Sequence, residues 1–231
     1  MTLVIAIDGP AGTGKSSAAK SLAQKYNFVY VDTGAVYRAL AYLVDINNID
    51  PNNTKDIVDL IPKLSIIIDS NSNFTKIIVD NKNLESELRT ENISRLASII
   101  SQHQKVREAL LPVQRNLALT IQQGAIFEGR DIGTVVFPKA PLKIFITATS
   151  ETRAQRRFQE IQRINPAASY QDILSGIKKR DERDETRSVA PMQKASDSYV
   201  IDTSHMSLLE VVDALSKLVE KTKHISGSKL W

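Results

Sequence analysis

The sequence predicts an α/β fold: a doubly wound, five-stranded parallel sheet with helices on both faces, a small antiparallel β insert and a helical lid. Short apolar runs typical of buried strands alternate with segments whose apolar residues recur at helical spacing. The pattern GPAGTGKS at 9–16, a phosphate-binding loop, joins the first apolar run to the first helical segment. Because ligands gather at the carboxyl ends of strands in such sheets, the motifs that follow each strand supply the candidate site residues.

Five apolar runs are expected to form the strands of the sheet. They lie at 3–7, 28–31, 125–127, 142–147 and 198–201. Helical segments are expected around 18–23, 37–44, 150–164, 169–187 and 206–223. Residues 91–123 form a longer helix-rich region, and Pro112 predicts an interruption in it because proline lacks the amide hydrogen that a helix interior needs.

The segment after the second helix has a different pattern. Runs typical of β structure lie at 64–68, 76–79 and near Leu84, and polar stretches at 69–73 and 80–83 separate them. We expect a small antiparallel meander there. It is either a substrate-side subdomain or a surface hairpin without a role in binding.

A length of 231 residues suits one α/β domain with insertions. We therefore expect a single domain over 1–231. Its core is expected at 1–58, 91–149 and 188–231, the insert at about 59–90 and the lid at about 150–187.

Composition narrows the classes of protein and of chemistry. The chain has no cysteine, which excludes disulfides, zinc–thiolate sites and thiol catalysis. The first apolar run is too short for a signal peptide, and no stretch approaches the ~20 apolar residues of a membrane span. The net charge of +4 could suggest a nucleic-acid partner, but the arginines recur beside carboxylates, as in a pocket for small phosphorylated molecules. We expect a cytoplasmic monomer without a membrane or nucleic-acid partner.

The loop at 9–16 predicts a site for a nucleoside triphosphate, although a glycine-rich turn with an incidental lysine is the alternative. Backbone N–H groups and the positive end of the following helix would surround the phosphates. Lys15 would reach the β- and γ-phosphates, and the Ser16 hydroxyl would ligate Mg²⁺. The expected ATP-binding residues are Gly9, Pro10, Ala11, Gly12, Thr13, Gly14, Lys15, Ser16 and Ser17.

Two helices carry charged side chains that could contact phosphates. Arg153 and Arg157 are four residues apart and can point the same way, unless they belong to a solvated basic face. Arg180, Asp184 and Arg187 fall on one helix face at i, i+4 and i+7, which could hold a sugar hydroxyl and a phosphate together. The alternative for this second group is an exposed salt-bridged helix.

Arg130 and Asp131 follow the third strand, where the backbone turns outward. An arginine there can grip a phosphate with two hydrogen bonds, and a carboxylate can accept one from an amino group. The alternative is a capping aspartate with a paired arginine.

Taken together, these residues resemble the bacterial cytidylate kinase family of P-loop nucleoside monophosphate kinases. The matching segments extend over most of the chain and are GPAGTGKS, VDTGAVYR at 31–38, VREALL at 106–111, GRDIGTVVFP at 129–138 and residues 180–191. The resemblance implies a phosphotransferase with a phosphate group as acceptor. It would use ATP and Mg²⁺ to phosphorylate CMP and dCMP in pyrimidine metabolism.

The resemblance also implies roles for individual residues. Arg38 and Arg130 would hold the acceptor phosphate; Ser98, Arg180 and Asp184 would face the sugar; and Thr33, Arg107, Asp131 and Arg187 would line the cytosine side, with Tyr37 as a wall. Lys15, Arg130, Arg153 and Arg157 would be the catalytic residues. Thr33 stands where serine is frequent, and Glu128 where aspartate is frequent, which leaves the part of Glu128 in ordering Mg²⁺-bound water open.

Two other interpretations remain at this stage. One is a kinase for another small acceptor, such as UMP, AMP or shikimate. The other is a P-loop protein that hydrolyses ATP and binds RNA through its basic surface. The absence of an aromatic-rich RNA-binding motif argues against the second.

Overall fold

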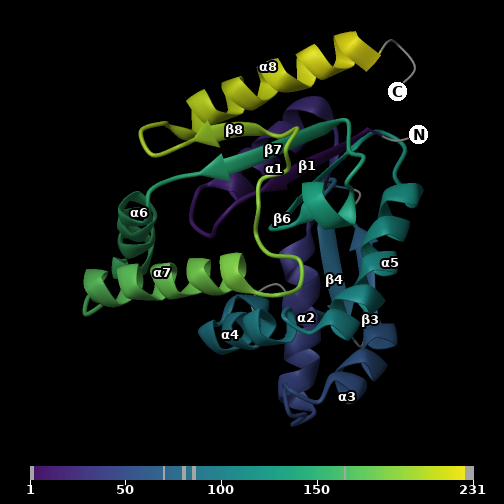
Figure 1. Cartoon of the computed structure of the whole chain (residues 1–231), viewed down its shortest axis with the longest axis vertical. Coiled ribbons are helices and arrows are strands. Elements are labelled where there is room, and N and C mark those ends of the chain that lie inside the picture. Colours follow the sequence, from purple (N-terminus) through teal and green to yellow (C-terminus); the bar gives the residue numbers. More distant parts are fainter. Residues whose placement is uncertain (1–2, 70, 80–81, 85–86, 164, 227–231) are drawn as a thin grey trace.

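A five-stranded, entirely parallel sheet organises the chain (Figure 1). The computed structural model describes residues 3–69, 71–79, 82–84, 87–163 and 165–226. The strands are β1 (Val4–Asp8), β2 (Val29–Asp32), β6 (Ala125–Gly129), β7 (Leu142–Thr147) and β8 (Tyr199–Asp202). Their order across the sheet is β2-β6-β1-β7-β8, and every neighbouring pair is parallel. The predicted sheet is confirmed, with β6 extended by Glu128 and Gly129.

Helices cover both faces of the sheet, as the alternation of strands and helices predicts. Ile5 and Ile7 pack with α1 (Lys15–Tyr26) and α8 (Leu208–Ser226), whereas Ala6 packs on the opposite face with α5 (Gln104–Thr120). Successive strand residues point to opposite faces, so a strand covered on both sides must be apolar throughout. This requirement explains the continuous apolar run at 3–7.

A third apolar cluster joins the insert to four helices. These are α2 (Thr33–Ile46), α3 (Thr54–Asp59), α4 (Glu91–Ile100) and the N-terminal half of α5. The insert itself is an antiparallel sheet of β3 (Leu64–Ile68), β4 (Thr75–Val79) and β5 (Lys82–Asn83), which confirms the predicted meander. Short 3₁₀ helices precede and follow it at Ile61–Lys63 and Glu87–Arg89; these, together with α3, are additions to the prediction.

The insert is attached to the edge of the central sheet. The Tyr30 N–H donates to the Asn73 carbonyl at 2.9 Å, and the Thr75 hydroxyl donates to the Tyr30 carbonyl at 3.3 Å. β2 is an edge strand, so these bonds satisfy backbone groups that would otherwise face outward. The attachment fixes the insert beside the end of β2, where one of the candidate motifs begins.

The predicted interruption near Pro112 is wrong. α5 runs unbroken through Pro112, and the break in this region falls at 101–103, between α4 and α5. Pro112 and Glu108, whose carbonyl loses its helical donor, both lie on the exposed face, where water can replace the missing bond. The buried face of α5, with Val106, Leu110 and Ala118, continues undisturbed.

Two helices form the region expected to be a lid. α6 (Ser150–Gln162) and α7 (Tyr170–Thr186) pack against each other, with the Phe158 and Tyr170 rings edge to face at 6.1 Å between centroids. In Figure 1, α6 and α7 stand at one side of the central sheet. α2, α4 and the insert lie below the sheet in this view, and α8 lies above it. Across the described ranges, no helix has the length and apolar character needed to cross a membrane.

Gly9 marks a close approach between the phosphate-binding loop and the sheet. Its φ is +143°, and a Cβ placed there would lie 2.0 Å from the Ile146 carbonyl oxygen in β7. A backbone atom of a central strand cannot move aside without disturbing the sheet. Only glycine fits this position.

Gly9→Ala should therefore destabilise the protein by about 3 kcal/mol or more, through steric overlap and backbone strain together. Gly176→Ala is a matched control because it lies within α7 with nothing within 4 Å of the added Cβ. It should stabilise the protein by about 0.5–1 kcal/mol through helix propensity. Denaturant unfolding of both variants measures the difference, and equal effects would contradict the close approach.

Candidate functional site

The phosphate-binding loop occupies residues 9–14, between β1 and α1. Gly14 caps α1 in a left-handed conformation, so Lys15 is the first helical residue. The Lys15 ammonium is buried, donates to the Pro10 carbonyl at 3.0 Å and lies 3.4 Å from Glu128 Oε1. Burial and the Arg130 charge lower the pKa of Lys15 to about 8 against the opposing effect of Glu128. A buried cation at a helix N-terminus is suited to an anion.

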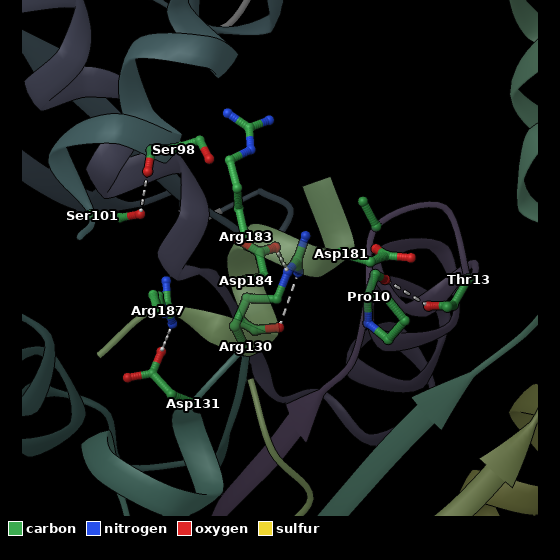
Figure 2. Close-up of polar contacts among 12 residues, drawn as sticks. Pro10, Thr13, Ser98, Ser101, Arg130, Asp131, Asp181, Arg183, Asp184 and Arg187 are labelled. Carbon is green, nitrogen blue, oxygen red and sulfur yellow. Dashed lines mark hydrogen bonds and ion pairs between the residues drawn. The ribbon is translucent and has the colours of Figure 1, made fainter. Parts of the chain in front are cut away.

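Three arginines face this lysine from the other side. Arg38 pairs with Asp32 at 2.7 Å, and Arg130 donates to Asp184 at 3.0 Å (Figure 2). Burial lowers the pKa of Arg180 to about 10, with contributions from the Arg130 and Arg38 charges. Among the described residues, the buried Nε atoms of Arg38 and Arg180 have no hydrogen-bond partner.

The charge of Arg130 lies near both Lys15 and Arg180, because it lowers the pKa of each. Mutual repulsion and unpaired donors raise the free energy of this arrangement, and a polyanion would relieve both. The structure thus places Lys15, Arg130 and Arg180 in one cationic region, and Arg38 pairs with Asp32 at the end of β2.

Asp131 belongs to a neighbouring polar cluster. Its carboxylate accepts a hydrogen bond from Arg107, and its other oxygen lies 3.7 Å from Arg187 Nη2 (Figure 2). The Arg107 guanidinium lies 5.4 Å from the centroid of the Tyr37 ring. The Thr33 hydroxyl is also buried, but it donates to the Glu128 carbonyl at 2.8 Å. The predicted residues Tyr37, Arg107, Asp131 and Arg187 are therefore in mutual contact.

The predicted shared helix face of Arg180, Asp184 and Arg187 is only partly correct. α7 ends at Thr186, and Arg187 is its extended C-cap residue, with ψ of 139°. Arg187 reaches Asp131 from beyond the helix, while its Nε donates to the Ala190 carbonyl. The chain must turn there because the Met192 N–H bonds back to the Asp184 carbonyl at 2.7 Å.

Ser98 lies on α4, and Figure 2 shows it beside Ser101, apart from the Arg130–Asp184 pair. Its carbonyl accepts from the Ser101 hydroxyl at 3.1 Å, which leaves the Ser98 side chain outside this bond. The Ser98 hydroxyl is buried without a hydrogen-bond partner among the described residues. A buried unsatisfied hydroxyl is the kind of group that a polar ligand satisfies.

Arg153 connects the lid helices to the phosphate-binding loop. Its Nη1 and Nη2 donate to the two carboxylate oxygens of Asp181 on α7 at 3.0 and 2.5 Å. Its Nε donates to the Ala148 carbonyl, and Nη1 also donates to the Ala11 carbonyl at 3.2 Å. Arg153 thus lies on the predicted lid helix and contacts the loop, with Asp181 as a partner that the sequence analysis did not single out.

Arg157 is not brought to the loop. It is exposed and pairs with Glu160 at 3.1 Å. Arg156 takes the inward position instead, donating to the Thr13 carbonyl at 3.3 Å and the Thr203 carbonyl at 2.6 Å. Positions i+3 and i+4 flank the same helix face, and the loop happens to lie on the i+3 side of Arg153.

Asp8 links the two halves of the site and was not singled out from sequence. Its two carboxylate oxygens accept from the N–H groups of Ile132 and Gly133 at 2.8 and 2.7 Å. These residues begin a π-helical turn, Ile132–Val136, directly after Arg130 and Asp131. Burial raises the pKa of Asp8 to about 6. The one feature of the sequence that could have indicated this role of Asp8 is its position immediately before the glycine-rich loop.

The donor set near the loop suits a hard cation shared with phosphates. Within the described ranges, no group of three or more His, Cys, Asp or Glu side chains could hold a metal ion. The oxygen ligands at the head of α1 are the exposed Ser16 hydroxyl and the nearby Glu128 carboxylate. Mg²⁺ is often held by one or two protein oxygens together with substrate phosphates, so these residues fit it.

Comparison with known proteins gives a consistent result over nearly the whole chain. The family model described as cytidylate kinase matches residues 5–221. A cytidylate kinase of Clostridium tetani is 44% identical over 222 residues, covering 96% of each chain. A cytidylate kinase of Caldicellulosiruptor bescii is 42% identical, covering 94% of this chain and 95% of the relative, and one of Clostridium botulinum is 39% identical, covering 96% and 99%.

Asp8→Asn should change how stability depends on pH. The folded pKa of about 6 lies above the ordinary value of 3.8, so the folded state binds this proton more tightly than the unfolded state. The native protein therefore loses the contribution of Asp8 as pH rises between about 4 and 7, by up to ~3 kcal/mol. The native-minus-variant free energy of unfolding should fall across this range in denaturant titrations.

The control for this experiment is Asp197→Asn. A hydrogen bond from Lys143 lowers the pKa of the exposed Asp197, so the native-minus-variant difference should move in the opposite direction. Parallel pH curves for native protein and Asp8→Asn would contradict the buried, ionisable state of Asp8.

Proposed function

The chain belongs to the cytidylate kinase family, and on that premise we propose that it transfers the γ-phosphoryl group of ATP to CMP and dCMP, giving CDP and dCDP. The observation that carries the proposal is the set of cations at the carboxyl edge of the sheet, where the buried Lys15 lies beside Glu128, Arg38 pairs with Asp32 and Arg130 pairs with Asp184. Two phosphates that must approach each other need such a region between their sites.

The donor half is the loop at Gly9–Ser17. Backbone N–H groups and the N-terminus of α1 would hold the ATP phosphates. The Lys15 ammonium, already aimed into the loop at the Pro10 carbonyl, would move to the β- and γ-phosphates. Ser16 would ligate Mg²⁺, and bound Mg²⁺ would neutralise the charge that develops on the transferring group.

The acceptor half is the opposite side of the cation region. Arg38 and Arg130 hold the phosphate of CMP. The buried Nε of Arg38, which has no hydrogen-bond partner among the described residues, supports this assignment. Arg130 is held close to its own loop, since its Nη1 donates to the Gly129 carbonyl. Ser98, Arg180 and Asp184 face the sugar. The unpartnered Ser98 hydroxyl and Arg180 Nε support that part, because each would gain a partner from a ribose or phosphate oxygen.

The cytosine side consists of Thr33, Tyr37, Arg107, Asp131 and Arg187. Cytosine presents an N4 amino donor beside N3 and O2 acceptors, and a carboxylate held between two arginines is complementary to that pattern. Uracil has a carbonyl at the position of the amino group, which leaves Asp131 facing an acceptor. An unpaired buried acceptor costs about 1–3 kcal/mol, or roughly five- to 150-fold in preference.

Transfer is a direct in-line displacement without a covalent enzyme intermediate. Arg153 and Arg157 belong to the lid at about 150–187, and Arg153 lies next to the loop through the Ala11 carbonyl. With the insert at about 59–90 on the acceptor side, closure of the two regions excludes water from the transferring group. The core at 1–58, 91–149 and 188–231 holds both sites in register.

A coupled ADP-release assay with CMP, dCMP, UMP, AMP and shikimate in parallel tests the proposal. CMP and dCMP should be turned over with the highest kcat/KM, and UMP should be roughly five- to 150-fold poorer. Equal or better turnover of AMP or shikimate would overturn the cytidine assignment. ATP hydrolysis that does not depend on any acceptor, together with salt-sensitive RNA binding, would favour the other class of protein.

Asp131→Ala should raise the KM for CMP roughly five- to 150-fold and leave the KM for ATP within about twofold, because the lost acceptor faces only the base. The preference for CMP over UMP should shrink at the same time. Asp197→Ala, which removes a mostly exposed carboxylate paired with Lys143, is the matched control and should change neither constant. An unchanged KM for CMP in the Asp131 variant would remove Asp131 from the acceptor site.

A further inference from the structure

The Tyr30 hydroxyl is buried on the α1 side of the sheet and bonds the carboxylate that pairs with Lys15. Tyr30 lies on β2 with 3% of its surface exposed, on the face covered by α1. Its hydroxyl donates to Glu128 Oε2 at 2.6 Å, and the other carboxylate oxygen of Glu128 lies 3.4 Å from the Lys15 ammonium. Burial and the Glu128 charge raise the pKa of Tyr30.

The direction of the Tyr30–Glu128 hydrogen bond follows from the two groups that make it. A carboxylate only accepts, so the hydroxyl proton of Tyr30 points to Glu128 Oε2. This bond holds Oε2 on the side of Tyr30, and Oε1 faces the Lys15 ammonium at the head of α1. A carboxylate that helps to hold a metal ion is commonly oriented by a hydrogen bond from a second residue, and Tyr30 supplies such a bond.

We propose that Tyr30 is a positioning residue that orients the Glu128 carboxylate toward the Mg²⁺ bound with ATP. The inference rests on the proposed function only in taking ATP as the ligand of the loop. It assigns to Tyr30 a role in nucleotide binding that its place inside a strand does not suggest.

The insert holds the Tyr30 side chain in this position. The Phe74 ring packs edge-on against the Tyr30 ring with 5.5 Å between centroids, and the Lys20 ammonium lies 5.5 Å from the centroid of each ring. The backbone of Tyr30 is bonded to Asn73 and Thr75 on either side of Phe74. The ring is therefore fixed from the acceptor-side insert, while its hydroxyl serves the donor-side loop.

Tyr30→Phe tests the proposal because it removes the hydroxyl and keeps the ring packed against Phe74. ATP binding is measured by calorimetry without CMP, once with Mg²⁺ and once with excess chelator. The Kd for ATP should rise about 3- to 10-fold with Mg²⁺ and stay within about twofold without it. Tyr26→Phe is the matched control. Its hydroxyl bonds the Ser216 carbonyl at 3.4 Å between α1 and α8, so both Kd values should be unchanged.

A double-mutant cycle with Glu128→Ala adds a second measurement. In the Glu128→Ala background, Tyr30→Phe should produce no further loss of Mg²⁺-dependent affinity, because the carboxylate that Tyr30 orients is gone. Phe74→Leu, which loosens the ring without touching the hydroxyl, should give a smaller loss of the same kind, and it serves as the test if Tyr30→Phe does not fold. Equal weakening with and without Mg²⁺, no weakening, or fully additive effects with Glu128→Ala would overturn the proposal.

The two proposals fail in distinguishable ways. Loss of CMP turnover from the native protein would overturn the proposed function but would leave the Mg²⁺ dependence of ATP binding measurable. Normal CMP turnover combined with an unchanged Mg²⁺ effect in Tyr30→Phe would overturn the role of Tyr30 alone.

Discussion

The concentration of buried cations at the carboxyl edge of the sheet is the constraint on which the rest of the structure depends. Lys15 is buried and Arg38 and Arg130 are partly buried, so each has lost water contacts, and the cations repel one another; the fold must therefore supply carboxylates close by. It does so one by one: Lys15 has Glu128, Arg38 has Asp32, and Arg130 has Asp184. Each carboxylate comes from a strand end or from α7. The pairing is incomplete, and the remaining positive potential is what a phosphate can use.

This constraint also explains how distant segments are joined. The carboxylates come from the ends of β2 and β6 and from α7, which belong to the core and to the region expected to be a lid. Asp8 adds a link of another kind, since its two oxygens accept from backbone N–H groups and not from an arginine. The π-helical turn after Asp131 is therefore fixed to the strand that delivers the phosphate-binding loop. The phosphate-binding loop and the turn after Asp131 are consequently both attached to the end of β1.

The sequence alone predicted most of the fold and the members of the charged clusters. Strands and the phosphate-binding loop depend on local patterns, and a parallel sheet brings the residues after each strand to one edge whatever the details. What it missed depends on tertiary contact. Arg156 and not Arg157 points to the loop because of where the loop lies relative to α6. α5 continues through Pro112 because this residue lies on the side of the helix that faces water. Asp8 and Tyr30 have no distinctive spacing, since their partners are backbone groups or lie far along the chain.

The contacts of Arg153 have a consequence for the order of events at the loop. A guanidinium has five N–H groups. Within the described part of the chain, four hydrogen bonds already occupy the guanidinium of Arg153: one to Ala148, one to Ala11 and two to Asp181. A phosphate that engages it with two hydrogen bonds must therefore displace Asp181 or the loop carbonyl. In the proposed reaction, where Asp181 is the partner displaced, binding of the triphosphate would break the contact of Arg153 with α7. The free energy of that contact would then subtract from nucleotide affinity.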